Sequence, residues 1–107
     1  MELRAAQTEI EAISRAYARI FTVDRTEDWL LLKLGEEVGE LNQAYLAATG
    51  RSRREGSDTA VEEELADVLA HVLLIAERRG IDLAAALESK WGQWSHLVTE
   101  EDRGSAE

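Results

Sequence analysis

The sequence predicts an all-α protein, and three observations support this. Its 107 residues include no proline and few glycines. They are rich in Ala, Leu, Glu and Arg, which favour helices. Apolar residues recur at helical spacing along most of the chain. The length predicts one domain, residues 1–107, with a core over about 24–94 and a flexible tail over 98–107.

Capping and stop signals divide the first half of the chain into two helices. The first is expected over about residues 2–20, where apolar residues follow a helical stripe. A polar connection follows, in which either Asp24 or Thr26 is suited to cap the next helix. That second helix is expected over about residues 27–48, with Gly50 as its C-terminal stop.

A Gly/Ser/Arg-rich loop precedes two further helices. Thr59 with Glu62 three residues later forms a predicted capping box, and the third helix runs from there to about Arg79. Asp82 is expected to cap a shorter fourth helix that reaches about Trp94.

Composition excludes several classes of site and partner. Without cysteine the chain forms neither disulfides nor thiolate metal sites. A net charge of −10 argues against binding a nucleic-acid backbone, because phosphates are repelled. The N-terminus lacks the pattern of a signal peptide, and no apolar run approaches the roughly 20 residues that cross a bilayer. We therefore expect a cytoplasmic protein that binds neither nucleic acid nor membrane.

Two predicted helices place acidic pairs on their apolar faces. On a helical wheel, Leu30 and Leu41 lie within about 60° of Glu37, so this carboxylate falls inside the apolar stripe, and Glu40 lies at its edge. In the third helix, Glu64 lies in the stripe in the same way, with Asp67 at its edge.

Buried carboxylates that face one another need a compensating charge. Lys33 is the only basic residue near these faces, whereas Mg²⁺, or Mn²⁺ in its place, prefers oxygen ligands and keeps sites open for phosphates. His71, one turn after Asp67, could orient it. Gly35 and Gly39 suggest either close helix packing or access for a ligand. The alternative for each acidic pair is a solvated helix face.

Two segments resemble a known family. The strings "GEEVGEL" and "EEELADVL" are similar to the E-E-x-x-E and E-x-x-D signature of the MazG-like all-α nucleoside triphosphate pyrophosphohydrolases. The likeness extends from about Trp29 to Lys90. The signature residues are Glu36, Glu37, Glu40, Glu64 and Asp67.

This resemblance implies a four-helix subunit whose bundle is completed by dimerisation, as a homodimer or a tetramer. It implies Mg²⁺-dependent hydrolysis of ribo- or deoxyribonucleoside triphosphates to monophosphate and pyrophosphate, with attack at the α-phosphorus by a metal-activated water, in nucleotide-pool housekeeping. Glu37, Glu40, Glu64 and Asp67 would bind the metal, and Glu36 and Glu37 would be the catalytic residues. Glu36 would orient water or support the ligands.

Basic and aromatic residues are candidates for substrate binding. A phosphate clamp could be formed by Lys33, Lys90 and the loop residues Arg51, Arg53 and Arg54, although an exposed arginine loop is often only solvated. Trp29 could stack on a base. Trp91 and Trp94 fit a subunit interface better. The segment after Lys90, "WGQWSH", departs from the family pattern.

Two other functions remain open at this stage. Phosphoribosyl-ATP pyrophosphohydrolase, an enzyme of histidine biosynthesis, resembles the chain in "KLGEE" and "ADVLAH". A non-catalytic helical oligomer, with acids that only solubilise it, is the alternative from another class.

Overall fold

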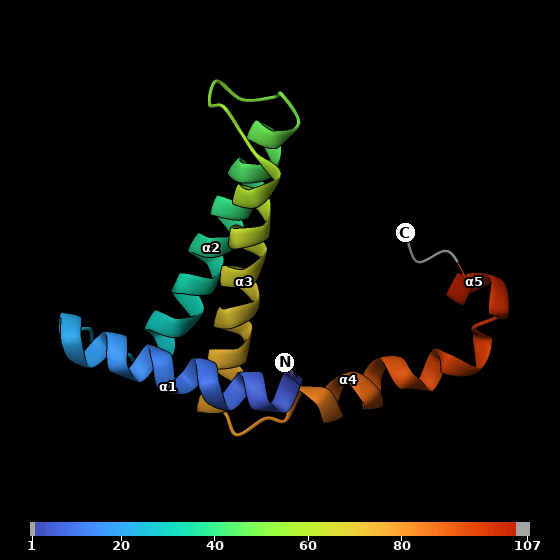
Figure 1. Ribbon diagram of the computed structural model, residues 1–107. Coiled ribbons are helices and arrows are strands. Elements are labelled where there is room, and N and C mark those ends of the chain that lie inside the picture. The colour runs from blue at the N-terminus through green and yellow to red at the C-terminus, as the bar shows by residue number, and fades with distance from the viewer. Residues whose placement is uncertain (1, 105–107) are drawn as a thin grey trace.

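The computed structural model describes residues 2–104, whose regular elements are all helical (Figure 1). In chain order these are α1 (Leu3–Phe21), α2 (Glu27–Ala48), α3 (Asp58–Arg78), α4 (Leu83–Trp91), the 3₁₀ helix η1 (Gly92–Leu97) and α5 (Glu100–Gly104). The all-α prediction is confirmed. No helix within this described range is long and apolar enough to cross a membrane.

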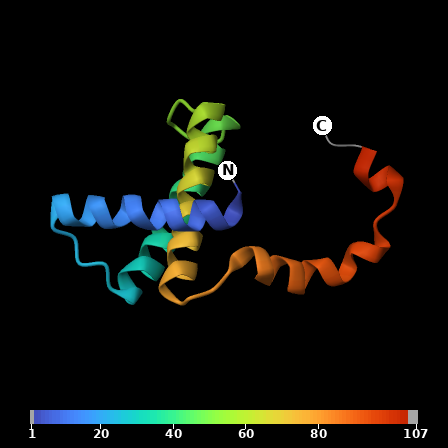
Figure 2. The ribbon, with the colours of Figure 1, turned by 60° about the horizontal axis from the view of Figure 1, so that its bottom comes forward.

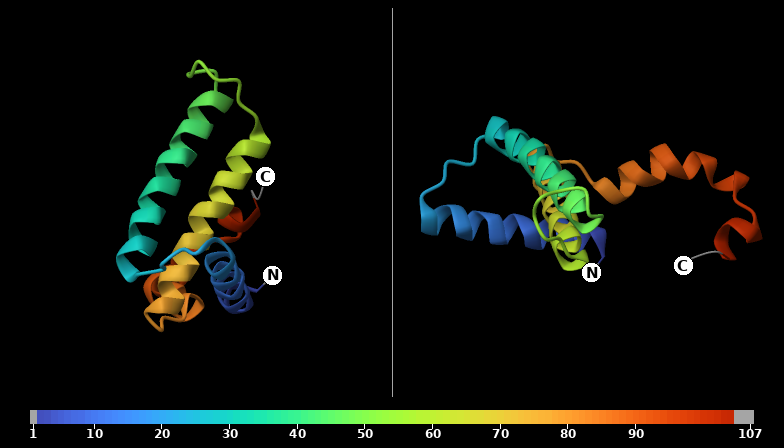
Figure 3. Two further views of the ribbon diagram at one scale, coloured as in Figure 1. Left: turned by 90° about the vertical axis from the view of Figure 1, so that its left-hand side faces the viewer. Right: turned by 90° about the horizontal axis from the view of Figure 1, so that it is seen from above.

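The two long helices α2 and α3 form a hairpin and lie side by side (Figure 3). Its small core lies near the open end, where Leu30 of α2 is buried together with Leu73, Leu74 and Ala76 of α3. α2 has its predicted bounds, and of the two candidate caps it is Thr26 whose hydroxyl accepts a hydrogen bond, at 3.0 Å from the Trp29 amide. Along the rest of the hairpin, few side chains between α2 and α3 are fully buried.

The predicted start of α3 was wrong by a few residues. The N-cap is Ser57, whose hydroxyl accepts from the amide of Ala60 at 3.1 Å, and the helix begins at Asp58. Thr59 and Glu62 therefore lie inside the helix instead of forming its capping box. Ser57 is the better cap because it also leaves Asp58 in the first turn, where a negative charge interacts favourably with the helix dipole.

Helix α1 crosses the open end of the hairpin (Figure 2). The side chain of Gln7 fixes it there. This side chain is 1% exposed. Its amide donates to Oε1 of Glu77 at 2.9 Å and to the carbonyl of Ile81 at 2.8 Å, and its carbonyl accepts from the Leu83 amide at 3.0 Å. One buried side chain thus joins α1, the end of α3 and the start of α4.

A second polar contact fixes the middle of α1. Arg25, in the α1–α2 connection, forms an ion pair with Glu11 at 2.6 Å, and both side chains are largely shielded from solvent. Burial alone would raise the pKa of Glu11, but the hydrogen bonds and charges of Arg25 and Arg15 outweigh it and hold that pKa below its ordinary value. The pair therefore stays ionised at neutral pH.

The segment after α3 leaves the hairpin. Gly80 adopts a left-handed conformation, with φ +68°, and Asp82 caps α4 as predicted, since its carboxylate accepts from the amide of Ala85. The arm formed by α4, η1 and α5 then extends away from α2 and α3 (Figures 1 and 2). The radius of gyration, 16.8 Å, exceeds the about 13 Å of a compact chain of this length.

The prediction that the fourth helix reaches Trp94 was wrong. The α-helix ends at Trp91 and continues as the 3₁₀ helix η1, where the Gln93 side chain donates to the Lys90 carbonyl at 2.6 Å. Of the expected flexible tail, the described part holds the short helix α5, within which Asp102 forms hydrogen bonds with Thr99, the residue before the helix. Residues 105–107 lie outside the described part.

Much apolar surface remains exposed on both the hairpin and the arm. On the arm, Trp91 is 71% and Trp94 55% exposed, so neither tryptophan belongs to a core of this chain. On α2, a side chain at Gly35 or Gly39 would meet nothing within 4 Å. The close helix packing that these glycines suggested is therefore not a contact within the described chain.

Candidate metal centre

The hairpin brings all five acidic residues of the predicted site together. Glu36, Glu37 and Glu40 each place a carboxylate oxygen within 4.8 Å of the other two, and so do Glu37, Glu64 and Asp67. Glu37 belongs to both groups and is the most buried of the five. The i, i+3 spacing on each helix accounts for this, because it places successive acids one turn apart on the facing sides of α2 and α3.

Burial and neighbouring acids raise the pKa values of Glu37 and Glu64. The pKa of Glu37 is raised first by burial and then by the negative charges of Glu40 and Asp67, while His71 acts in the opposite direction. The pKa of Glu64 is also raised, by burial first and then by Glu40 and Asp67. Ionisation of the whole cluster is therefore unfavourable unless a positive charge lies among the carboxylates.

Two observations show that the residues suit a divalent cation. Oε2 of Glu37 and Oε2 of Glu64 are buried, and neither has a hydrogen-bond partner among the described residues. Two oxygens bound to one Mg²⁺ at about 2.1 Å each lie at most about 4.2 Å apart, so only a small contraction of each 4.8 Å group would be needed. The all-oxygen donor set suits Mg²⁺ or Mn²⁺.

Lys33 is paired with Glu36 at the edge of the cluster. Its ammonium donates to Oε1 of Glu36 at 2.7 Å. The pKa of Lys33 is raised, chiefly by this hydrogen bond, with smaller contributions from Glu37 and Glu40. Glu36 is exposed, which agrees with its predicted outer position. The charge of Lys33 thus compensates one acid, and no ion pair among residues 2–104 involves Glu37 or Glu64.

His71 contacts the backbone of Asp67 and not its carboxylate. Nδ1 lies 2.8 Å from the Asp67 carbonyl oxygen, and since a carbonyl only accepts, Nδ1 carries the proton of this bond. The expectation that His71 orients the Asp67 side chain is not supported by this contact.

A groove of about 750 Å³ leads away from the acids, between α1, α2 and α3. Glu37, Asp67 and His71 line one part of it, and Lys33 and Trp29 also contribute to its walls. Trp29 therefore lines the same groove as Glu37 and Asp67, about two helical turns from Glu37 along α2. Because the groove is continuous with the acidic cluster, a ligand bound at the cluster would extend into it.

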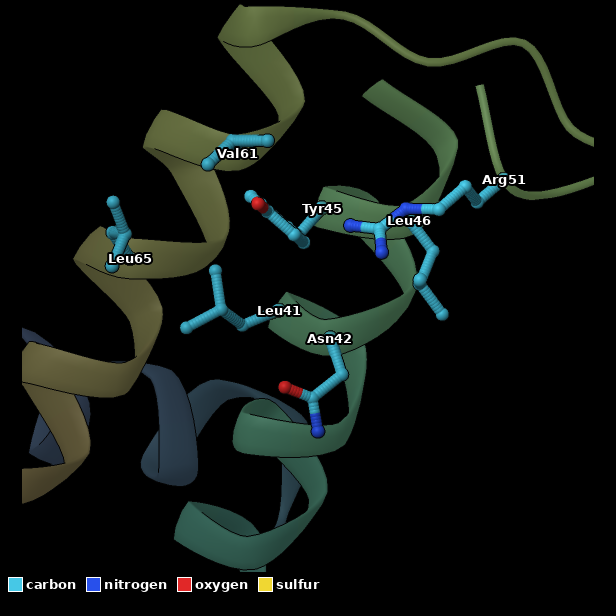
Figure 4. Close-up of a pocket in the computed structure, with 7 residues that line it drawn as sticks. All are labelled: Leu41, Asn42, Tyr45, Leu46, Arg51, Val61 and Leu65. Carbon is cyan, nitrogen blue, oxygen red and sulfur yellow. The ribbon is translucent and has the colours of Figure 1, made fainter. Parts of the chain in front are cut away.

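The three loop arginines do not share one location. Arg54 lines a small cavity together with Glu40 and Glu64. Arg51 lies on the other side of the hairpin, where its guanidinium carbon is 5.3 Å from the centre of the Tyr45 ring, in the pocket of Figure 4. Arg53 is exposed. Gly56 limits the path of this loop, because a Cβ there would lie 2.2 Å from the Ala47 carbonyl carbon.

The structure separates the last predicted substrate residue from the others. Lys90 is exposed in the final turn of α4, on the arm, and does not line the groove beside the acids. Conversely, sequence analysis missed the groove residues that α1 supplies. Ile13 and Tyr17 are apolar-stripe residues, but nothing in their spacing indicates which helices they face.

Comparison with known proteins gives one match. Residues 25–91 match the family model of the MazG nucleotide pyrophosphohydrolase domain. No curated protein and no solved structure matches the chain. The matched segment is more than half of the sequence and contains all five acids of the cluster, so the resemblance predicted from the two signature strings is confirmed. The chain therefore belongs to the family of MazG nucleotide pyrophosphohydrolase domains.

Proposed function

We propose that this protein hydrolyses ribo- or deoxyribonucleoside triphosphates to the monophosphate and pyrophosphate in a Mg²⁺-dependent reaction, with a housekeeping role in the nucleotide pool. The carrying observation is the cluster of five carboxylates in which Glu37 and Glu64 each keep a buried, unpartnered oxygen. The family match supports the reaction class. The acidic charge near the site favours a cation-bound substrate over a free polyanion.

In this proposal Glu37, Glu40, Glu64 and Asp67 hold the metal. When bound, the cation supplies charge neutralisation on the phosphates and lowers the pKa of a water molecule. Glu36, held by Lys33 at the edge of the cluster, is positioned to accept the proton of the attacking water. The water oxygen bonds to the α-phosphorus, the bond to the bridging oxygen breaks, and pyrophosphate leaves with that oxygen.

We further propose that two copies of the chain complete the site, as a homodimer or a tetramer. The exposed apolar residues support this, because contiguous apolar side chains on a surface are typical of protein interfaces. Two surfaces carry them. One is the hairpin face shown in Figure 4, with Leu41, Tyr45 and Leu65. The other is the arm, with Trp91 and Trp94. An assembled partner would also account for Lys90, which within one chain lies away from the acids.

An endpoint assay tests the proposed reaction. Purified protein with Mg²⁺ is incubated with a panel of ribo- and deoxyribonucleoside triphosphates and with phosphoribosyl-ATP, and the products are separated by anion exchange. We expect monophosphate and pyrophosphate, and complete loss of turnover with EDTA. Diphosphate and inorganic phosphate would contradict attack at the α-phosphorus. Turnover of phosphoribosyl-ATP alone would assign the other pyrophosphohydrolase activity.

Glu64→Gln tests the metal ligands. We expect kcat to fall at least about a hundredfold, because a lost ligand removes several kcal/mol of charge stabilisation. The pKa of Glu64 is raised in the folded chain, so its ionised form destabilises the metal-free fold at pH values above 4.5, the ordinary pKa of this group. The variant should therefore have an equal or higher Tm at pH 7 without Mg²⁺. That gain should vanish as the pH falls below 4.5.

The matched control is Glu62→Gln, an exposed acid on the same helix. It should leave kcat and the Mg²⁺-induced rise in Tm unchanged. Full activity of Glu64→Gln would rule out our assignment of the cluster.

Arg54→Ala, with Arg51→Ala as its control, tests the phosphate clamp. Arg54 shares a cavity with two of the acids, whereas Arg51 lies against Tyr45 on the other side. We expect the Arg54 variant to raise KM for the triphosphate about three- to tenfold, as for a lost charge-assisted contact in a solvated site, and the Arg51 variant to change it less than twofold. Equal effects of both variants would contradict the assignment.

Sedimentation velocity at micromolar concentration tests the assembly. We expect a dimer or tetramer, and Leu65→Glu should shift it toward the monomer, because the charge enters an interface while the side chain is exposed in the single chain. Activity should fall with the shift. A wild-type protein that is monomeric and fully active would exclude a site completed by a second copy.

A further inference from the structure

The groove beside the acidic cluster has two chemically different parts. At one end lie the carboxylates of Glu37 and Asp67. Away from them its walls are largely apolar and aromatic, with Trp29 from α2 and Tyr17 from α1. A volume of about 750 Å³ lies within the range of small-ligand sites. A nucleoside triphosphate has the same division, with a polyanionic end and a planar, weakly polar end.

Helix α1 supplies two hydroxyl groups to this groove. Ser14 and Tyr17 both line it, one turn apart on the same face of the helix. Among the described residues, neither hydroxyl forms a hydrogen bond with another group of the chain. Tyr17 is further supported by Phe21, whose ring centre is 4.5 Å from its own. Both hydroxyls are thus free to contact a ligand, and one belongs to a supported aromatic ring.

Two contacts on the N-terminal side of these residues fix the position of α1. Gln7 holds the helix to Glu77, Ile81 and Leu83, and Glu11 holds it to Arg25. A wall anchored in this way provides a fixed geometry for hydrogen bonds to a ligand. α1 also lies outside residues 25–91, the segment that matches the family model. The wall is therefore a feature of this chain beyond the shared domain.

We propose that Ser14 and Tyr17 form the nucleoside-recognition wall, and that selectivity among bases is determined there. The inference rests on the proposed function. Tyr17 and Trp29 contact the faces of the base, for which aromatic side chains are suited whatever its identity. The hydroxyl of Ser14 forms a hydrogen bond with the base edge. Such a polar contact discriminates because a base without the matching group leaves the hydroxyl unpaired.

The test uses the full chain and three variants, Tyr17→Leu, Tyr17→Phe and Ser14→Ala. Kinetic constants are measured with the best nucleotide of the panel and with a poorer one, and inorganic tripolyphosphate serves as a competitive inhibitor without a base. Tyr17→Leu should raise KM about tenfold or more with kcat within about twofold, because stacking is lost in ground and transition state alike. Tyr17→Phe should keep most of the affinity.

Ser14→Ala should change the ratio of kcat/KM between the two nucleotides at least about fivefold. The inhibition constant of tripolyphosphate should stay unchanged in all three variants, because it binds only at the acidic end. Thr8→Ala is the matched control on α1, since the Thr8 hydroxyl bonds to the Arg4 carbonyl and lies outside the groove. It should change neither KM nor the ratio.

Each other outcome overturns the inference in a distinguishable way. An inactive wild-type protein refutes the proposed function, and the recognition wall falls with it. An active wild type whose KM and base preference are unchanged in Tyr17→Leu and Ser14→Ala refutes the wall alone. If the inhibition constant of tripolyphosphate rose together with KM, the variants would be disturbing the acidic end of the groove. A change of oligomeric state in Tyr17→Leu would assign the groove to a second copy of the chain.

Discussion

Mutual repulsion among the carboxylates between α2 and α3 is the constraint on which the rest of the structure depends. Like charges a few ångströms apart repel one another, and they do so more strongly where water is partly excluded. The hairpin holds Glu37 and Glu64 in this position although few fully buried apolar side chains stabilise it. The helices therefore pair in spite of the acids, and a cation at this position would turn repulsion into attraction.

The unfavourable cluster explains why the remaining contacts are concentrated at the open end of the hairpin. Leu30, Leu73 and Leu74 are buried there, and α1 is fixed across it. Gln7 satisfies three partners, one in α3, one in the α3–α4 connection and one at the start of α4, so α1 cannot shift without leaving buried polar groups unpaired. The contacts that stabilise the fold lie beside the acidic cluster, so the buried oxygens of Glu37 and Glu64 need no hydrogen-bond partner among the described residues.

Much of the fold and of the acidic cluster could be predicted from the sequence, because both follow from local spacing. The helical wheel placed Glu37 in the apolar stripe, and it is the most buried acid of the cluster. The cap of α3 was missed, since Ser57 and Thr59 are both residue types that cap helices and it is Ser57 that accepts from a backbone amide in the first turn. The sequence also could not show that Arg54 and Arg51 lie at different places on the hairpin, because the path of the loop depends on the contact of Gly56 with the end of α2. The groove wall was missed for the same reason, as the placement of α1 depends on the tertiary bonds of Gln7.

The left-handed residue Gly80 has a consequence for how proteins built on this plan can diversify. The direction of the whole arm is set over a few residues, by one positive φ angle and by the bonds of Gln7 to Ile81 and Leu83. These positions lie outside the carboxylate cluster. Substitutions at this single joint could therefore redirect the arm while every residue of the carboxylate cluster stays unchanged.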